Sequence, residues 1–253
     1  MNINTLALLA AAVAPAITIM VYFYSKDKGD REPFSILLIS FICGCFSVLP
    51  AIILETALPE IIPSSQGASL LSVGIFTFGI VAMSEEFCKY IFLRYYAYKR
   101  HSFNEPYDGI IYAVMVGMGF ATIENLMYVF GADTAAGQWG SAGFRAITAV
   151  PAHATFAAVM GYYVGLAKFN KSNERSLLFR GFILAVLLHG FYDFCLFQNL
   201  TWGLTLGALV SLVVGIRFSR RAIKLHKQNP LSKSHVISTA IDGDNFESPA
   251  RPS

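Results

Sequence analysis

The chain has 253 residues, of which 55% are hydrophobic and only 14% are charged, and its mean hydropathy is +0.54. A soluble domain carries roughly 25% Asp, Glu, Lys and Arg. This composition excludes a soluble enzyme, a disordered chain and a nucleic-acid-binding protein, whatever the formal net charge of +3 suggests, and indicates an integral membrane protein.

Long apolar stretches predict an all-α, polytopic bundle of about seven transmembrane helices. A helix needs about 20 apolar residues to cross the hydrocarbon core of a bilayer. In chain order the predicted spans cover 4–24, 34–54, 68–93, 109–130, 143–167, 181–198 and 200–218. Because only a few residues near Asn199 separate the last two, six spans with a re-entrant pair are the main alternative.

The basic residues orient the bundle. Seventeen of the 19 Lys and Arg residues follow the first, third, fifth and seventh spans, whereas the connections around 55–67, 131–140 and 199 contain none. Basic residues on every second connection are the positive-inside pattern. The sequence therefore predicts an N-terminus outside the cell and a C-terminus in the cytoplasm, with Trp139 and Trp202 at the outer interface.

Two parts of different composition follow one another along the chain. Residues 1–225 are predicted to form one transmembrane domain, and the polar residues 226–253 a disordered cytoplasmic tail. The first apolar stretch is expected to be a span and not a cleaved signal peptide, because it is long and its basic residues follow it. All four cysteines fall inside spans, where we interpret them as small apolar residues.

Seven Asp, Glu, Lys and His side chains lie inside the predicted spans, and four of them are carboxylic acids. An acidic or basic residue at the centre of a membrane helix costs about 2.5–3.5 kcal/mol, so four unpaired carboxylates cost on the order of 10 kcal/mol. We therefore expect these groups to meet each other, a metal ion or a water-filled cavity. They are Glu85, Glu86, Lys89, Glu124, His153, His189 and Asp193.

The third span carries two adjacent glutamates and a lysine. Lys89 is four residues after Glu85 and three after Glu86, so it can neutralise either carboxylate on one helix face. If Lys89 only neutralises one carboxylate so that the helix enters the membrane more easily, one glutamate is explained. The second then remains an unexplained energetic cost. Two carboxylates beside one ammonium indicate a division of roles, one held ionised and the other free to accept a proton.

The fourth and fifth spans add a carboxylate, an amide and an imidazole. Glu124 and Tyr128 share a helix face, and Asn125 lies about 100° round the helix, where an interhelical hydrogen bond is the alternative to a functional role. His153 follows Pro151 by two residues, and a proline can free backbone carbonyls nearby. A histidine bonded to such a carbonyl is the alternative to a catalytic or metal-binding one.

The sixth span carries His189 and Asp193, whose spacing places them on one helix face as two metal ligands or as a histidine oriented by a carboxylate. Zinc prefers three or four N and O ligands with a position open for water. Glu124, His153, His189 and one glutamate of the pair would supply such a set. Metal-assisted hydrolysis of a peptide bond is then possible chemistry. Without metal, a glutamate would activate water while an imidazole polarises the carbonyl.

These motifs resemble the PrsW family of intramembrane proteases, which is distantly related to the CAAX-processing (Abi) membrane proteases. The resemblance extends from about the first span to the sixth. Relative to the CAAX-processing proteases, Lys89 comes one residue earlier than their arginine, and Glu124 stands where they have histidine, which leaves both the metal-dependent and the metal-free route open. The motifs are Asp30-x-Glu32-Pro33, Glu85-Glu86-x-x-Lys89, Glu105-Pro106-x-Asp108-Gly109-Ile110, Gly119-Phe-Ala-Thr-Ile-Glu124-Asn125 and His189-x-x-Tyr192-Asp193.

The resemblance implies an endopeptidase of the bacterial inner membrane that cleaves a membrane-anchored, single-span protein, such as an anti-sigma factor in an envelope-stress response. It includes Glu105 and Asp108, at the cytoplasmic end of the fourth span, where acidic groups also favour the helix dipole. These two residues are expected either to line the site or to hold its loop. The expected catalytic residues are Glu85, Glu86, Glu124, His189 and Asp193, supported by Lys89, Asn125, His153, Glu105 and Asp108.

A proton-coupled transporter or channel is the alternative function, because chains of Asp, Glu and His also form proton relays within membranes. Transporters often have inverted repeats and broken helices, which this sequence does not clearly show. Two small-residue patterns, Gly161-x-x-x-Gly165 and Gly203-x-x-x-Gly207, favour close helix packing inside the bundle over dimerisation.

Overall fold

The computed structural model describes residues 3–27, 31–57 and 69–197, and five single residues between 213 and 224. The described ranges are helical and contain no strand. The seventh predicted span, Trp202, the Gly203–Gly207 pattern and the tail at 226–253 lie outside these continuous ranges. The helices are α1 (Ile3–Lys26), α2 (Phe34–Ala57), α3 (Leu70–Gly74), a π-helical segment (Ile75–Ala82), α4 (Met83–Tyr95), α5 (Asp108–Phe130), α6 (Ala135–Ile147), α7 (Ala149–Phe169) and α8 (Glu174–Phe197), with short 3-10 turns at Ala97–Lys99 and Lys171–Asn173.

Six stretches of the described residues are long and apolar enough to cross a membrane, and they match the first six predicted spans. The prediction of an all-α, multi-pass membrane protein is thereby confirmed. The six stretches are Ile3–Lys26, Phe34–Ala57, Leu70–Lys99, Asp108–Phe130, Ala135–Phe169 and Lys171–Phe197.

The fifth span differs from its prediction, because it begins near Ala135 and not near 143 and is bent where α6 meets α7. The backbone at Thr148 leaves the helical region, with φ −121° and ψ −78°. Pro151 has no N–H to donate to the carbonyl four residues earlier, which explains an interruption at this point. The first turns of α6 are rich in Ala and Gly, so hydropathy marks the start of this helix poorly.

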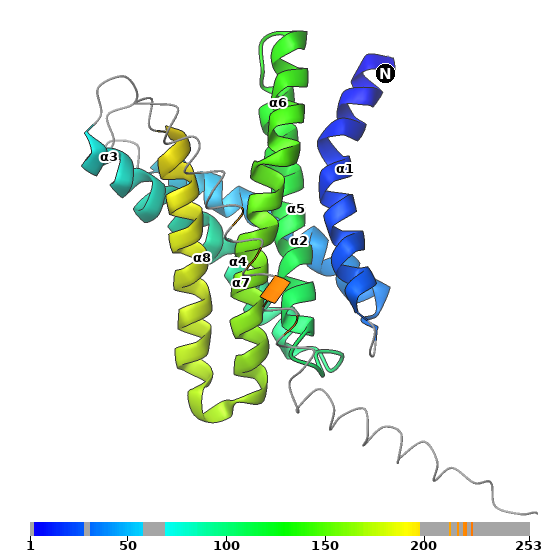
Figure 1. Ribbon diagram of the computed structural model, residues 1–253, viewed down its shortest axis with the longest axis vertical. Coiled ribbons are helices and arrows are strands. Elements are labelled where there is room, and N and C mark those ends of the chain that lie inside the picture. Colours follow the sequence, from blue (N-terminus) through cyan, green and yellow to red (C-terminus); the bar gives the residue numbers. More distant parts are fainter. Residues whose placement is uncertain are drawn as a thin grey trace, which may run out of the picture.

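The central helix α5 packs against α1, α2 and α7 (Figure 1). Glycines allow two of these backbones to approach closely. A Cβ atom at Gly161 of α7 would lie 2.3 Å from the carbonyl oxygen of Gly109, and one at Gly119 of α5 would lie 2.0 Å from that of Phe41 in α2. The small-residue pattern beginning at Gly161 therefore serves packing inside the bundle, as predicted.

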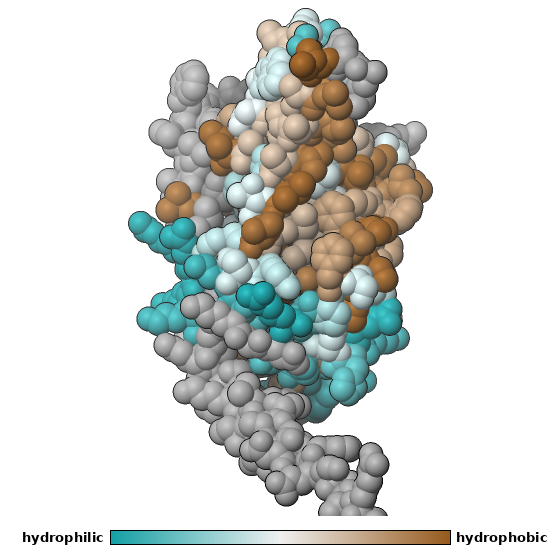
Figure 2. All heavy atoms as spheres, turned by 90° about the vertical axis from the view of Figure 1, so that its right-hand side faces the viewer, coloured by the Kyte–Doolittle hydropathy of each residue, from teal (hydrophilic) through white to brown (hydrophobic). Residues whose placement is uncertain are grey.

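Polar and apolar side chains separate along the length of the bundle. Figure 2 shows hydrophobic side chains over the middle and upper parts of one face and hydrophilic side chains at its lower end. The C-terminal end of α1, with Lys26, and the turn at 170–173, with Lys171, lie at this lower end in Figure 1. By the positive-inside rule we assign this end to the cytoplasm.

A single helical rod formed by α3, the π-helical segment and α4 carries the glutamate pair. The π-helical segment ends at Ala82, three residues before Glu85. Its wider turns change the angular position of every residue that follows, and π-helical turns occur often at functional sites. The backbone of α8 comes so close to this segment that a Cβ atom at Gly190 would lie 2.4 Å from the ring of Phe78. This packing brings the rod against the helix that carries His189.

Candidate active site

A cavity of about 800 Å³ lies among α2, the π-helical segment, α4, α5, α6, α7 and α8. Most of its lining is apolar, for example Val48, Phe120 and Phe156. It extends to Gly131 and Phe197, at the predicted outer ends of α5 and α8. The ionisable residues that line it are Glu55, Glu85, Glu124, Arg145, His153, His189 and Asp193.

Lys89 connects the glutamate pair with His153 just behind the cavity wall. Its Nζ lies 3.0 Å from Glu85 Oε2, 2.8 Å from Glu86 Oε1 and 3.1 Å from His153 Nδ1. It also lies 3.9 Å from the centre of the Phe120 ring, a cation–π distance. One buried ammonium thus bridges both carboxylates of α4 and the imidazole of α7.

His189 lies on the other side of the glutamate pair. Its Nδ1 is 3.0 Å from Glu86 Oε1, and its Nε2 is 3.2 Å from Asp193 Oδ2 and 3.9 Å from Glu85 Oε2. The ring of Phe156 stacks on the imidazole with centres 4.9 Å apart and planes 18° apart. Both ring nitrogens therefore face carboxylate oxygens, and the plane of the ring is fixed.

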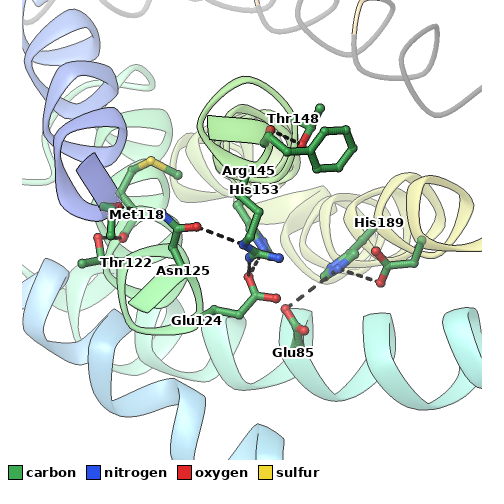
Figure 3. Close-up of polar contacts among 12 residues, drawn as sticks. Glu85, Met118, Thr122, Glu124, Asn125, Arg145, Thr148, His153 and His189 are labelled. Carbon is green, nitrogen blue, oxygen red and sulfur yellow. Dashed lines mark hydrogen bonds and ion pairs between the residues drawn. The ribbon is translucent and has the colours of Figure 1, made fainter. Parts of the chain in front are cut away.

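Glu124 joins the same network through His153 (Figure 3). Its Oε2 lies 2.8 Å from His153 Nε2 and 2.7 Å from Arg145 Nη2. Asn125 Oδ1 accepts a hydrogen bond from Arg145 Nε at 2.9 Å, and Asn125 Nδ2 donates to the carbonyl of Ala12 at 2.7 Å. Asn125 therefore holds α1, α5 and α6 together next to the site, which is the interhelical contact considered as an alternative from the sequence.

Sequence reasoning did not assign three residues that contribute to this site. Arg145 binds Glu124 and Asn125, Phe156 stacks on His189, and Glu55 accepts a hydrogen bond from Ser84 Oγ at 3.1 Å. Arg145 could have been identified from the sequence, because it and Lys89 are the two basic residues that do not follow the positive-inside pattern. The positions of Phe156 and Glu55 depend on helix packing, and their spacing in the chain gives no sign of it.

Glu105 and Asp108 lie apart from this cavity, at the cytoplasmic end of α5. Asp108 Oδ2 accepts the backbone N–H groups of Asn104 at 2.9 Å and of Glu105 at 2.6 Å. This arrangement satisfies two backbone donors of the loop that leads into the helix. Of the two roles expected for these acids, the structure places Asp108 in the one that holds the loop.

Four side chains of the site are placed to hold a metal ion. One potential ligand atom from each of Glu85, Glu86, His153 and His189 lies within 4.8 Å of the others, and all four residues are buried. This group contains both glutamates and omits Glu124, which the expected zinc set contained; the Oε2 atom of Glu124 contacts Arg145 and His153 instead. The donor types suit zinc. Glu86 Oε2 fits this use, because it is buried without a hydrogen-bond partner among the described residues.

Comparison with known proteins decides the family. Residues 32–219 match the family described as PrsW family intramembrane metalloprotease. The chain belongs to this family. It is 36% identical over 205 residues to Protease PrsW of Geobacillus kaustophilus, an alignment that covers 79% of this chain and 84% of that protein.

Two further PrsW relatives give the same result. Protease PrsW of Clostridioides difficile is 37% identical over 204 residues, covering 79% of this chain and 84% of that protein. Protease PrsW of Bacillus subtilis is 34% identical over 197 residues, covering 78% and 85%. No solved structure matches the chain. The PrsW resemblance inferred from the motifs is confirmed, and the chain is a multi-pass intramembrane protease that works in a lipid bilayer.

Proposed function

We propose that the Glu85–Glu86–His153–His189 group is the active site at which this PrsW-family protease hydrolyses a peptide bond of a single-span membrane protein. The observation that carries the proposal is that two carboxylates and two imidazoles meet beside one cavity, within 4.8 Å of one another. Carboxylates and imidazoles supply general acid–base catalysis, and this cavity gives a substrate segment access to them.

Glu85 and Glu86 take different roles in this proposal. Glu85 lines the cavity, whereas Glu86 is not among its lining residues and is held by Lys89 and His189. Glu85 is therefore the base that removes a proton from the attacking water. Glu86 and Asp193 orient His189, which faces the cavity and is placed to donate a proton to the developing oxyanion or to the leaving amine.

Zinc is the metal that this donor set favours. Glu86, His153 and His189 would hold the ion as three protein ligands, and Glu85 would remain as the base. A bound Zn²⁺ polarises the scissile carbonyl and makes water a stronger acid. In the metal-free route His189 and Lys89 supply the positive charge of the site. Lys89 already contacts three of the four potential ligands, so its long side chain has to move when an ion binds.

The first prediction concerns the glutamate pair. Co-expression with tagged single-span membrane proteins is expected to yield a cleavage product with the wild-type chain and none with the Glu85→Gln/Glu86→Gln double variant, because the base is lost. The measurement is immunoblotting of the tag, with equal amounts of both enzymes in the membrane fraction. Full cleavage by the double variant would rule out this site.

The second prediction separates the two catalytic routes. Elemental analysis of the purified protein is expected to find about one equivalent of zinc, as three protein ligands and one open position require. Removal of the metal with a chelator should stop cleavage, and added Zn²⁺ should restore it. A metal-free protein whose cleavage is insensitive to chelators would show that the glutamate–imidazole route operates alone.

The substrate is proposed to be an anti-sigma factor, which follows from the resemblance and not from the geometry of the cavity. A panel of single-span proteins that includes anti-sigma factors tests this point separately from the chemistry. Proton flux in liposomes that persists without any proteolysis would favour the relay considered as the alternative, in which the same Glu, His and Asp side chains pass protons.

A further inference from the structure

Arg145 is a basic residue at membrane depth, and neither the family motifs nor the proposed chemistry uses it. Among the described residues that line the cavity, it is the only Lys or Arg. Its side chain is 12% exposed. A charged group costs about 2.5–3.5 kcal/mol at the centre of a membrane helix, so its contacts indicate what it does there.

The guanidinium of Arg145 is fixed by three groups of α5. Nη2 lies 2.7 Å from Glu124 Oε2, Nε donates to Asn125 Oδ1 at 2.9 Å, and Cζ lies 4.1 Å from the centre of the Tyr128 ring. Asn125 is itself anchored on the carbonyl of Ala12 in α1. A planar, always charged guanidinium held in this way presents a fixed donor to Glu124.

This fixed donor determines how Glu124 meets His153. An ionised carboxylate only accepts hydrogen bonds, and Glu124 Oε2 lies 2.8 Å from His153 Nε2. Nε2 of His153 therefore carries the hydrogen. In the neutral ring the other nitrogen, Nδ1, then has a free lone pair. This atom faces Lys89 Nζ at 3.1 Å, on the side of the glutamate pair.

The two imidazoles of the site are consequently unlike each other. Both ring nitrogens of His189 face carboxylates, those of Glu86 and Asp193. Nδ1 of His153 faces a donor. A carboxylate behind a histidine commonly fixes the ring tautomer and raises the basicity of the other nitrogen at metal sites. Here that carboxylate is itself held by an arginine.

We propose that Arg145 is a positioning residue that, by clamping Glu124, keeps His153 in its Nε2–H tautomer with the Nδ1 lone pair directed at Lys89, beside the glutamate pair. The inference rests on the proposed function of that group. It assigns to α6, which carries none of the family motifs, the task of preparing the acceptor nitrogen of the site. Loss of the clamp lets the ring rotate or change tautomer, so the acceptor is no longer in place.

The test uses the purified full chain, with histidine rings labelled with ¹⁵N, in wild-type, Arg145→Met and Arg145→Lys forms. The chain has five histidines, and the spectrum of His153→Gln identifies the signals of this ring. Wild type is expected to show one tautomer, protonated at Nε2, and Arg145→Met a mixture. Arg145→Lys keeps the charge but not the forked contact and should lie between them. Arg175→Met, at an exposed arginine of α8, is the matched control and should resemble wild type.

Two further readouts separate positioning from folding. Loss of an outer-shell partner typically costs about 10–100-fold in activity or metal affinity, so Arg145→Met should lower kcat, and the affinity for Zn²⁺ in competition with a chromophoric chelator, by that factor with little change in KM. If Arg145→Met fails to fold, the Arg145→Met/Glu124→Gln variant removes both charges together. It is expected to fold, with His153 in mixed tautomers and the same loss of kcat.

A single Nε2–H tautomer in either variant, together with wild-type kcat, would overturn the role of Arg145. That result leaves the proposed function intact as long as the glutamate variants stay inactive. Conversely, failure of the wild-type chain to cleave any tagged substrate counts against the proposed function, while the tautomer spectra still decide whether Arg145 positions His153.

Discussion

Cleavage by Glu85→Ala is expected to fall by about 10²–10⁴-fold, the usual contribution of a general base, and to be partly restored by added formate. Glu85 lines the cavity, so removal of its side chain leaves space that a small carboxylate can enter from the cavity. Formate then takes the proton that Glu85 would have taken. The measurement is the rate of substrate cleavage in proteoliposomes at increasing formate concentration.

Glu86→Ala provides the matched comparison, because it removes the same group from the neighbouring position. Its activity is also expected to be lost, since Glu86 orients His189, but formate should not restore it. Glu86 is 1% exposed and is not among the residues that line the cavity. Equal rescue of both variants, or rescue of Glu86→Ala alone, would show that the roles of the two glutamates are assigned wrongly.

Glu124→Gln and His189→Ala are both expected to abolish cleavage, for different reasons. Glu124→Gln keeps the shape of the side chain but can turn an amide donor towards His153 and Arg145, which disturbs the tautomer of the imidazole. His189→Ala removes the ring between Glu86 and Asp193. Each change removes one partner of buried contacts, with Arg145 in the first case and with Glu86 and Asp193 in the second, so some loss of stability is expected beside the loss of activity.

Much of the fold was predictable from the sequence, because the bilayer restricts the choices. Within the membrane a chain of this hydropathy satisfies its backbone hydrogen bonds as helices, and the first six predicted spans match six described helical stretches. The start of α6 and the bend at Thr148 were not predicted. A hydropathy scan averages over the small and polar residues at 135–142 and does not detect a helix interruption that one proline causes.

The sequence indicated most of the ionisable side chains that the structure brings together, but neither Arg145 and Glu55 nor the way in which the side chains pair. The cost of burying charge singled out the seven ionisable side chains, and the spacing from Glu85 to Lys89 and from His189 to Asp193 matches contacts within single helices. Contacts between helices follow no such spacing. Whether Glu124 faces a metal ion or Arg145 depends on how α5 and α6 are rotated about their axes, and no local pattern in the sequence specifies those rotations.

Lys89→Met is expected to cause the largest loss of stability, about 3–5 kcal/mol, because breaking a buried ion pair leaves uncompensated charge. The two buried carboxylates of Glu85 and Glu86 would lose the ammonium group that they share in the wild-type chain. The measurement is the free energy of unfolding in mixed micelles, with a chelator present. Lys171→Met is the matched control: its side chain is 68% exposed and pairs with Glu174, so its loss should cost no more than about 1 kcal/mol.

Two additional comparisons show whether charge balance is the cause. The Lys89→Met/Glu85→Gln/Glu86→Gln triple variant has neither the ammonium nor the two carboxylates, so it should regain most of the lost stability without regaining activity. Added Zn²⁺ should stabilise Lys89→Met, because the carboxylates and imidazoles that held the ammonium can bind the ion instead, and should have little effect on the triple variant. If Lys89→Met is as stable as wild type in the presence of chelator, the ammonium is not what keeps the glutamate pair in the membrane.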